Sequence, residues 1–361
     1  MAKKAILIAN IDTADFNNNG ITKKLIGQAK GLSSCGYDVD ILSNWKNEVR
    51  LNGSMILQNS LPKLISKLNW YKPLYTVFSA NYDLLWLRHH VVTPDLIRFL
   101  DYVKSQSYDT KIIIDLPTYP YNQEWRGVKG SLALLIDKTY AKKLHRYVDL
   151  ITHSGPETEL FGIRTVKLSN GIDISEVPLN TSTNPELTNI VAIGKWQYWH
   201  GLDRVIKGLS PDDHIELHVV GEGPYLSKLK AINNRMNLGT VIFHGALSRD
   251  RLNDLFNSCD LGIGTLGIHR KGVPINSSLK HREYCARGIP FIYSGSDPDF
   301  DTCHFIKRYE EDESVIHLDE LRTFYNKIET IKDPQIIRDH GKNHLSWSRK
   351  IRPVIERVMN S

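Results

Sequence analysis

The regular alternation of short apolar runs with amphipathic helical stretches constrains the fold of this chain most. In the first half, the expected strands are 4–10, 39–43, 84–87, 111–115 and 150–153, and the expected helices are 22–33, 94–104 and 132–147. A strand, a helix and a second strand in succession form a βαβ unit, whose two strands are parallel. The first half is therefore expected to be a parallel sheet covered by helices.

A second series of the same kind follows the polar, proline-containing segment 179–188, which has the composition of a linker. Its expected strands are 190–193, 216–220, 241–244, 261–264 and 291–293, and its expected helices include 201–208, 225–237 and 248–257. We predict an α/β chain of two Rossmann-like, doubly wound domains, residues 1–172 and 173–345. Ligands of such sheets bind beyond the carboxyl ends of the strands, so the loops there should face a central cleft between the domains.

Composition supports a globular chain of this size. The 361 residues are 41% apolar and 24% charged, which is enough for two hydrophobic cores. The cysteines form no CxxC pair, no signal-peptide pattern is present, and no run of about 18 apolar residues could span a bilayer. We expect a cytoplasmic protein.

Charge is divided unevenly between the two halves. Residues 1–170 hold 22 Lys and Arg against 15 Asp and Glu, a net +7, and the remainder holds 24 against 25, a net −1. This asymmetry indicates an anionic partner for the first half, such as phosphate, a membrane surface or nucleic acid. Nucleic acid is disfavoured, because no RNP-like, zinc-finger or bZIP pattern occurs.

Lys280 and Glu283 form the most informative pair of functional candidates. They lie three residues apart on one helical face, just before the Gly288-Ile289-Pro290 entry to a strand. The ammonium could neutralise diphosphate oxygens while the carboxylate accepts hydrogen bonds from two ribose hydroxyls, as a sugar nucleotide requires. The same spacing also fits an ion pair on an ordinary surface helix.

Other strand-end loops carry compatible chemistry. Lys195 follows one expected strand and His200 precedes the next helix, so both could reach one diphosphate. Gly221 and Gly223 form a tight turn that would allow a close backbone approach to a ligand, although a plain strand-to-helix turn is equally compatible. His244 ends another strand, where a lone histidine is more often structural.

The first strand-to-helix loop is a candidate anion site. It is polar and ends in Asn19-Gly20, directly before the first expected helix. The N-terminus of a helix after a glycine attracts anions. The loop does not match the GxGxxG fingerprint of dinucleotide-binding proteins.

The ordered set of these motifs resembles the GT-B glycosyltransferases, particularly the GT4 family of bacterial polysaccharide and glycolipid enzymes. The set consists of GKWQYWHG (194–201), VVGEGP (219–224), FHGALS (243–248), CDLGIGTL (259–266) and SSLKHREYCARGIPFIYSG (277–295). Asn19-Gly20 stands in the place of the family's glycine-rich first loop, and NGID (170–173) resembles its domain junction. The resemblance covers nearly the whole chain. It implies an N-terminal acceptor domain, a C-terminal donor domain, and a terminal helix, 346–361, that packs back on the first domain.

Two departures from the family pattern concern the donor site. The Arg and Lys of the family's GRx4KG motif fall on Lys195 and His200, and a neutral histidine neutralises less charge than lysine. In the E-x7-E motif the second glutamate falls on Glu283, but Ile275 replaces the first. We therefore expect Ser278, Leu279 and Lys280 to contact the phosphates or the donor sugar.

The resemblance implies transfer of a hexose from a nucleoside diphosphate sugar, with a UDP-sugar favoured, to a sugar hydroxyl of a lipid-linked or polysaccharide acceptor. Anomeric configuration would be retained, and neither a metal nor another cofactor is expected. Fixed cations at Lys195 and Lys280 would stabilise the charge that grows on the leaving diphosphate. The D-x-D spacing at Asp297 and Asp299 could hold a divalent ion in another fold, but its setting among Pro, Gly and Ser indicates a turn.

The acceptor is expected to meet loops of the first half. His89, Tyr119, Tyr121 and Glu124 follow expected strands, and aromatic faces with interspersed carboxylates suit a sugar ring. Asp115 occupies roughly the place of a strand-end histidine in GT4 relatives, so it is a candidate base. A loop that merely packs its aromatic side chains is the alternative.

Residues 61–72 form a basic amphipathic segment that could lie in a membrane interface, or could bury its leucines in the protein core. Interfacial binding would place the protein at the inner face of the cell membrane. Two other functional classes remain open: a nucleotide-sugar epimerase of the same architecture, and a non-catalytic partner subunit that has kept the fold. Intact Lys195, Lys280 and Glu283 argue against the second.

Overall fold

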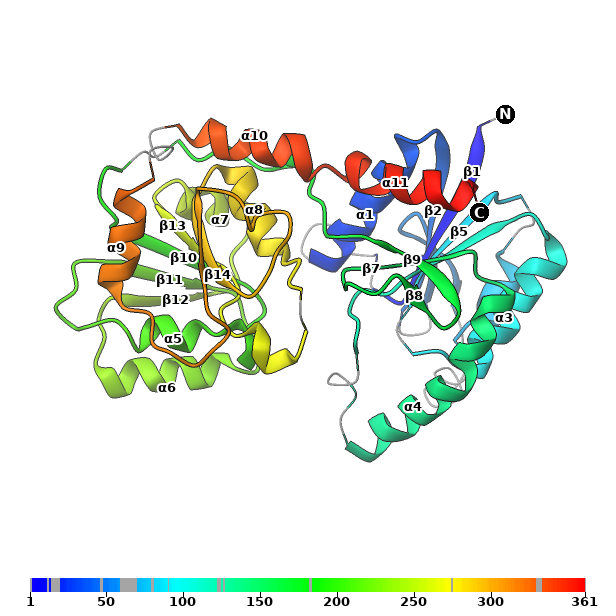
Figure 1. Ribbon diagram of the computed structural model, residues 1–361, viewed down its shortest axis with the longest axis horizontal. Helices are drawn as coiled ribbons and strands as arrows, with labels where there is room; N and C mark the ends of the chain where they lie inside the picture. Colours follow the sequence, from blue (N-terminus) through cyan, green and yellow to red (C-terminus); the bar gives the residue numbers. More distant parts are fainter. Residues whose placement is uncertain are drawn as a thin grey trace. The chain divides into compact units, whose positions relative to one another are not determined.

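The computed structural model describes residues 2–360 except 12, 14–19, 46–47, 59–69, 79–80, 90, 122–124, 126, 182–183, 274 and 329–332 (Figure 1). The described chain forms two compact units. Unit 1 comprises residues 1–171 together with 347–361, and unit 2 comprises residues 172–346. Each unit is an α/β body built on one mainly parallel sheet.

Unit 1 is built on a nine-stranded sheet in the described chain. Its order is β4(Ser54–Gln58), β3(Glu48–Leu51), β2(Tyr37–Trp45), β1(Lys3–Ala9), β5(Leu84–Arg88), β6(Lys111–Asp115), β7(Leu150–His153), β9(Ile163–Lys167) and β8(Glu159–Leu160). Strands from β2 through β7 to β9 are parallel, whereas β3, β4 and β8 pair antiparallel at the two edges. The antiparallel β3–β4 hairpin was not anticipated from the sequence; both of its strands are short and lie at the edge of the sheet, outside the βαβ alternation.

Central strands of this sheet are buried on both faces, which explains their continuous apolar sequences. In β1, Ile6 and Ile8 enter one core cluster, while Ala5, Leu7 and Ala9 enter the other. The first cluster is covered by α3(Pro94–Gln106), and the second by α1(Gly20–Ser33) and α11(Trp347–Met359). Further along, α4(Gly127–Tyr140) is followed by the 3-10 turn η3(Ala141–Arg146), where the sequence indicated one helix over 132–147.

Two glycines allow α11 to approach α1 closely. A Cβ added at Gly27 would lie 2.0 Å from Trp347 Nε1, and one at Gly31 would lie 2.8 Å from the carbonyl oxygen of Trp347. Gly27 and Gly31 are four residues apart, so both face the same neighbour. Ile351 and Val354 of α11 are fully buried in this contact region of unit 1.

We expect the double substitution Gly27→Ala/Gly31→Ala to destabilise the protein by about 1–3 kcal/mol through overpacking, although alanine favours the helix intrinsically. Chemical denaturation measures the change. Gly239→Ala is the matched control, because a Cβ there would meet nothing within 4 Å. A double variant as stable as wild type would show that α11 is not held by this contact.

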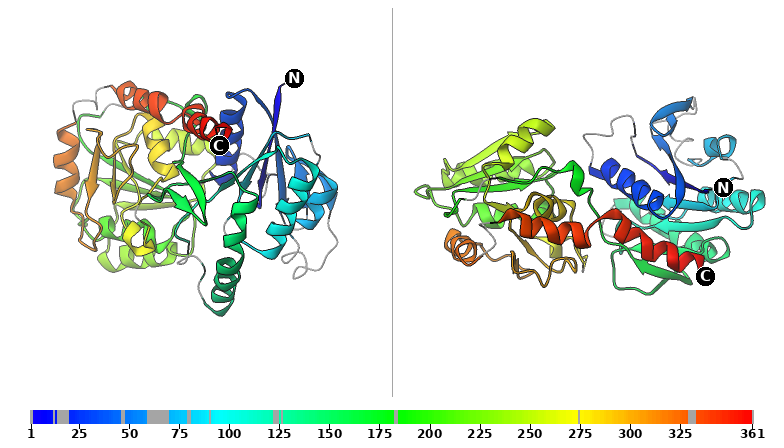
Figure 2. Two further views of the ribbon diagram at one scale, coloured as in Figure 1. Left: turned by 45° about the vertical axis from the view of Figure 1, so that its right-hand side comes forward. Right: turned by 90° about the horizontal axis from the view of Figure 1, so that it is seen from above.

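Unit 2 contains an all-parallel sheet of six strands in the described chain (Figure 2). Its order is β12(Val241–Gly245), β11(Glu216–Val220), β10(Asn189–Ile193), β13(Leu261–Ile263), β14(Phe291–Ser294) and β15(Ile306–Tyr309). The helices are α5(Leu202–Ile206), α6(Leu226–Met236), α7(Arg249–Phe256), α8(Leu279–Arg287), α9(Leu318–Asn326) and α10(Pro334–His344), with short 3-10 turns η4(Ile174–Glu176), η5(Tyr198–His200) and η6(Ile268–Lys271).

Two clusters of buried side chains lie on the two faces of this sheet. In β10, Ile190 and Ala192 enter one cluster and Val191 enters the other. The described structure thus confirms the predicted fold class of two Rossmann-like domains with parallel sheets. In each unit, the loops that follow the carboxyl ends of the parallel strands are the expected positions of ligand-binding residues.

Candidate functional site

The carboxyl end of β10 gathers the strongest site features of unit 2. Gly194 follows β10 with φ of 155° and precedes exposed Lys195 and buried Trp196. The Gly221 and Gly223 turn packs against this loop: a Cβ at Gly221 would lie 2.1 Å from the carbonyl oxygen of Gly194, and one at Gly223 would lie 2.4 Å from the backbone nitrogen of Trp196. These glycines therefore permit a close approach of two strand-end loops.

Lys280, in the first turn of α8, projects to this loop. Its side chain is buried, with 8% of the residue exposed, and its ammonium has no hydrogen-bond partner in the described part of the chain. Nζ lies 5.1 Å from the ring centroid of Trp196 and 3.4 Å from the position a Cβ would take on Gly194. Burial lowers the pKa of Lys280 to about 7. A buried ammonium without a counterion is costly, so the position favours an anionic ligand.

His200, the last residue of η5, lies at the same spot. Its Cε1 is 3.5 Å from the Cβ position of Gly194, beside Lys280 Nζ. Its Nδ1 accepts a hydrogen bond from the backbone N–H of Gln197, at 3.4 Å. Burial, and then the charges of Lys280 and Lys271, lower the pKa of His200 to about 2. The imidazole is therefore neutral and presents its Nε2–H as a donor.

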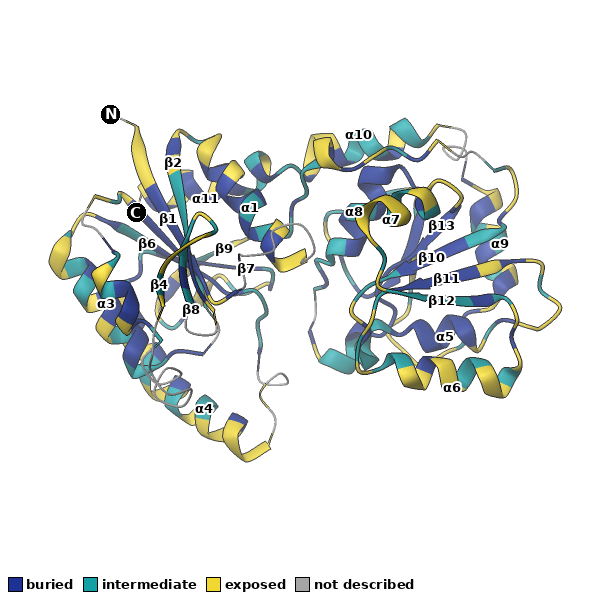
Figure 3. Ribbon diagram, turned by 180° about the vertical axis from the view of Figure 1, so that it is seen from behind, coloured by how far each residue is buried: buried dark blue, intermediate teal, exposed yellow. Residues whose placement is uncertain are grey.

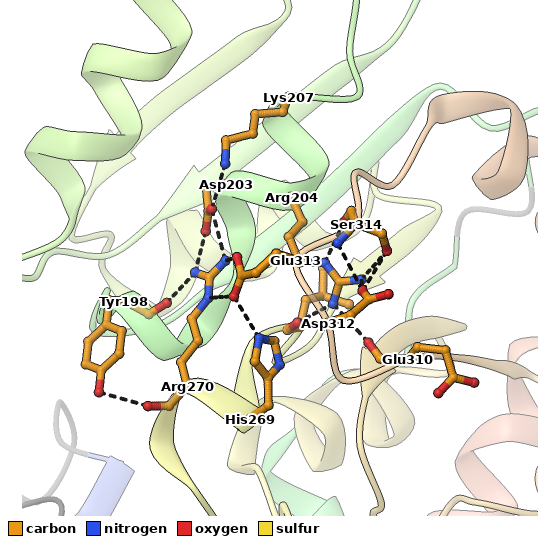
Figure 4. A network of polar contacts seen from close by, with 11 residues as sticks. Tyr198, Asp203, Arg204, Lys207, His269, Arg270, Glu310, Asp312, Glu313 and Ser314 are labelled. Atoms are coloured by element: carbon orange, nitrogen blue, oxygen red, sulfur yellow. Dashed lines mark hydrogen bonds and ion pairs between the residues drawn. The ribbon is translucent and has the colours of Figure 1, made fainter.

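A network of ion pairs and hydrogen bonds links η5, which ends at His200, to η6 and α5 (Figure 4). Arg270 of η6 donates to the carbonyl oxygen of Tyr198 at 2.7 Å and to both carboxylate oxygens of Asp203, at 2.8 and 3.1 Å. The Tyr198 hydroxyl donates back to the carbonyl oxygen of Arg270 at 2.9 Å, and Glu313 accepts from the same guanidinium. The position of the His200 turn is thereby fixed by side chains of three separate segments.

Lys271 adds a cation that sequence reasoning missed. Its Nζ lies 5.4 Å from the ring centroid of Trp199, and its charge contributes to the lowered pKa of His200. The consecutive basic residues His269, Arg270 and Lys271 were a signal in the sequence that could have indicated this cation. Lys280, His200 and Lys271 together form a positive, partly dry site suited to phosphate oxygens.

Glu283 does not pair with Lys280, although both are on α8. Its Oε1 accepts from Arg287 Nε at 2.8 Å, in an i,i+4 ion pair, and the side chain is partly exposed. Arg287 also donates to Asn253 and lies over the ring of Phe256. The alternative of an ion pair between Lys280 and Glu283 is therefore wrong, and a ribose role for Glu283 stays a prediction.

Ser278 and Leu279 begin α8 beside Lys280 and are half-buried. The Ser278 side chain makes no capping bond, so the first N–H groups of α8 and this hydroxyl lie together at the N-terminus of the helix. Ile275, in place of the first glutamate, forms an isolated bridge with Ser296. A direct role for Ser278 and Leu279 stays a prediction.

The side chain of His244 contacts a second histidine, His218. Its Nε2 lies 3.1 Å from Nδ1 of His218, which is buried in β11 and whose Nε2 lies 3.2 Å from Oδ1 of Asn189. Burial, and then the neighbouring His244, lower the pKa of His218. This contact gives His244 a structural role, and its predicted contact with the donor is untested.

Asp297 and Asp299 form ion pairs with the buried Arg282 of unit 2. Arg282 donates to both carboxylates, and His281 Nδ1 lies 2.8 Å from Asp297 Oδ2. Asp301 accepts from the backbone N–H of Asp297 at 2.9 Å, as expected of a turn. Among the residues that the structure describes, no cluster of three or more His, Cys, Asp or Glu side chains could hold a metal ion.

Asp115, the candidate base, ends β6 in a buried polar cluster of unit 1. Its carboxylate accepts from Gln28 at 3.1 Å and from Thr152 at 3.0 Å, and it lies 3.9 Å from Lys24 and 3.6 Å from Arg88. Burial would raise the pKa of Asp115, but the two cations outweigh it and lower the pKa below its ordinary value. An ionised carboxylate with several partners is a weak base, so this geometry favours a structural role.

Side chains predicted to contact the acceptor divide between core and surface. The ring of Tyr119 is half-buried and lies 5.7 Å from Tyr121 and 6.0 Å from buried His153. Tyr121 is buried and donates to Asp137 at 2.7 Å. His89 lies 2.8 Å from the Tyr71 hydroxyl. Tyr119 and His89 are thus half-buried, whereas Tyr121 belongs to the core.

Some predicted sites fall outside the described residues. Asn19 and Glu124 belong to this group, and so do residues 61–69 of the amphipathic segment. Gly20, beside Asn19, is exposed at the start of α1. At the end of the amphipathic segment, Tyr71 is buried and the Trp70 indole donates to Asn44, so this aromatic pair belongs to the core. No helix in the described ranges is long and apolar enough to cross a membrane.

Comparison with known proteins shows the fold. No protein-family model matches the chain, and no curated protein matches its sequence. Sucrose-phosphate synthase from Thermosynechococcus elongatus aligns with a TM-score of 0.63 at 12% identity, covering 99% of this chain and 97% of that one. HepE from Anabaena, in complex with UDP and glucose, aligns with a TM-score of 0.63 at 13% identity, covering 99% of this chain and 100% of that one. The catalytic domain of starch synthase IV from Arabidopsis thaliana, bound to ADP and acarbose, gives 0.65 at 11%, covering 99% of both. The chain therefore has the two-domain GT-B fold of these glycosyltransferases.

Proposed function

We propose that this protein is a glycosyltransferase that moves a hexose from a nucleoside diphosphate sugar to a hydroxyl group of an acceptor. One observation carries the proposal: the unpartnered, buried ammonium of Lys280 lies beside neutral His200 at the carboxyl end of β10. Fold likeness to proteins solved with UDP or ADP supports a nucleotide diphosphate as the anion. A UDP-sugar is the favoured donor.

The chemistry follows from the charges at this site. When the bond between the sugar and the diphosphate breaks, negative charge grows on the leaving oxygens. Lys280 would be protonated by the approach of the diphosphate, because an anion raises the pKa of a nearby ammonium. Lys280, Lys271 and exposed Lys195 then stabilise the leaving group more strongly in the transition state than in the ground state. His200 donates its Nε2–H without adding charge.

We propose a reaction that retains anomeric configuration and needs no metal, since fixed lysines supply the positive charge that a metal would supply elsewhere. The acceptor is proposed to be a sugar hydroxyl of a lipid-linked or polysaccharide substrate. The half-buried ring of Tyr119 in unit 1 supports recognition of a sugar ring. Membership of the GT4 family remains part of this proposal.

A thermal-shift panel of UDP, GDP, dTDP and ADP with their common sugars tests the donor. Ligand binding to the folded state raises the melting temperature by mass action, and we expect one nucleotide series, the uridine series, to do so. Lys280→Ala should abolish the shift and Glu283→Ala should reduce it. If no nucleotide stabilises the protein, the donor site is not functional, and the fold would be that of a non-catalytic partner subunit. Conversion of the donor without an acceptor would instead indicate an epimerase.

A further inference from the structure

Helix α4 of unit 1 carries an apolar surface that the protein itself leaves uncovered. Val128 is 88% exposed, Leu132 58% and Leu135 63%. At about 100° per residue, these three side chains fall within roughly 60° of one another around the helix axis. They therefore form one continuous stripe along α4, which we call the α4 stripe.

The opposite side of α4 is the one that packs on unit 1. Gly130 is buried, and a Cβ there would lie 2.4 Å from the backbone of Trp125. Asp137 is also buried, where it accepts from the backbone N–H of Val92 at 2.6 Å and from the Tyr121 hydroxyl at 2.7 Å. Figure 3 shows α4 as a helix with extensive exposed surface. The α4 stripe is thus an extra apolar face, beyond the one that folding requires.

Charges around the α4 stripe are positive. Lys129 and Lys138 are exposed on its two flanks, and Lys142 and Lys143 follow in η3. The acidic residue of this helix, Asp137, is buried and faces the core. In the part of the chain that the structure describes, no carboxylate pairs with Lys129, Lys138 or Lys142. Lysines on both sides of an apolar stripe suit a surface with an apolar interior and anionic head groups, because their ammonium groups can reach the head groups.

We propose that the α4 stripe docks the protein on an anionic lipid bilayer, with α4 lying in the plane of the interface. The apolar side chains enter the boundary of the acyl chains, and Lys129 and Lys138 contact the anionic head groups on either side. A second copy of this chain is a poorer occupant, since two such helices would bring their lysines together. This surface is distinct from residues 61–72, and the proposal does not depend on the proposed glycosyltransferase activity.

Co-sedimentation of the full chain with vesicles tests the proposal. We expect binding to vesicles of phosphatidylcholine and phosphatidylglycerol in equal parts, weaker binding at high salt, and little binding to phosphatidylcholine alone. Leu132→Glu/Leu135→Glu should weaken binding at least about tenfold. Lys129→Gln/Lys138→Gln should weaken binding to the anionic vesicles only. Ile336→Glu on α10, which is 46% exposed, is the matched control and should bind as wild type does.

Three outcomes would overturn the proposal: no binding of the wild-type protein, equal binding of the Leu132→Glu/Leu135→Glu variant, or loss of binding in the Ile336→Glu control. Light scattering after size exclusion adds a separate check. A wild-type dimer that this double variant dissociates would assign the α4 stripe to a second copy instead. The nucleotide thermal shift should be unchanged in this variant, so failure here is distinguishable from failure of the proposed function.

Discussion

Replacing Lys280 with methionine should abolish donor use while making the ligand-free protein more stable. The ammonium is buried and has no hydrogen-bond partner among the described residues. Loss of one fixed charge from the site should lower kcat by about 10²–10³-fold, or roughly 3–4 kcal/mol in the barrier. Replacing a buried unpaired charge with an apolar side chain of similar length should raise the free energy of unfolding by about 1–4 kcal/mol.

The stability gain should depend on pH in a direction set by the pKa of Lys280. This pKa is lowered from 10.5 to about 7 in the folded protein, so the unfolded chain binds more protons between these values. Wild-type stability therefore gains from Lys280 as pH rises from 7 toward 10.5. The difference between Lys280→Met and wild type should be largest at or below pH 7 and should shrink toward pH 10.

Donor binding should show the opposite dependence in wild type. Above pH 7 the free lysine is neutral, so binding of a diphosphate must take up a proton, and affinity should fall as pH rises. Calorimetry of UDP binding in two buffers with different ionisation enthalpies measures this uptake. Lys327→Met, at an exposed position of unit 2, is the matched control and should change neither stability nor binding. A Lys280→Met variant that binds UDP normally would exclude Lys280 from the donor site.

Arg282→Met should cause the largest loss of stability in unit 2. The guanidinium and the Asp297 carboxylate are both fully buried, with two hydrogen bonds between them, and Asp299 accepts a further one. Removing the arginine leaves a buried carboxylate whose remaining hydrogen-bond partner in the described chain is His281. Such a change costs about 3–5 kcal/mol. Urea denaturation, followed by tryptophan fluorescence, measures the loss.

Two controls separate the buried pair from a general loss of charge. Arg308→Met removes an arginine that is half-exposed and 3.8 Å from Asp301, so it should cost at most about 1 kcal/mol. Arg282→Met/Asp297→Asn removes both charges and should recover part of the loss. An Arg282→Met protein as stable as the Arg308→Met protein would contradict the assignment.

Lowering the pH should remove the contribution of Asp297 to the free energy of unfolding of the wild-type protein. Burial would raise the pKa of this carboxyl, but Arg282 and His281 outweigh burial and lower it from 3.8 to about 2. A carboxyl whose pKa is lowered on folding stabilises the folded state at pH values above its pKa in the unfolded chain. That contribution is lost as pH falls from about 4 to 2. The Arg282→Met variant should lose most of this acid dependence.

The sequence alone was enough for the fold because its signals are local and repeated. Continuous apolar runs such as 4–10 and 111–115 must be buried on both faces, and helical stretches between them leave a parallel sheet as the arrangement that buries all of them. Strands β3 and β4 are short, lie outside this alternation, and gave no such signal. The division of 132–147 between α4 and η3 was missed as well, since local spacing does not distinguish an α-helix from a following 3-10 turn.

For the candidate site, the sequence indicated a set of loops but not the partners of their side chains. Motif order placed Lys195 and His200 in a loop after a strand, and Lys280 on a helix, of the same domain. Spacing on α8 suggested that Lys280 and Glu283 share a function, but the fold buries Lys280 against Gly194 and pairs Glu283 with Arg287. Asp115 looked free at its strand end, whereas folding surrounds it with side chains from distant positions.

The sequence by itself determined the periodicity, the glycine positions and the distribution of charge, because these properties belong to neighbouring residues. Only the tertiary structure decided which charges are buried, which are paired, and which, like Lys280, have no counterion. Pairing and desolvation depend on groups brought together across long stretches of chain, and these determine the pKa of a side chain. For the same reason, the α4 stripe could be recognised only from the tertiary structure, which shows that the opposite face of α4 packs on unit 1.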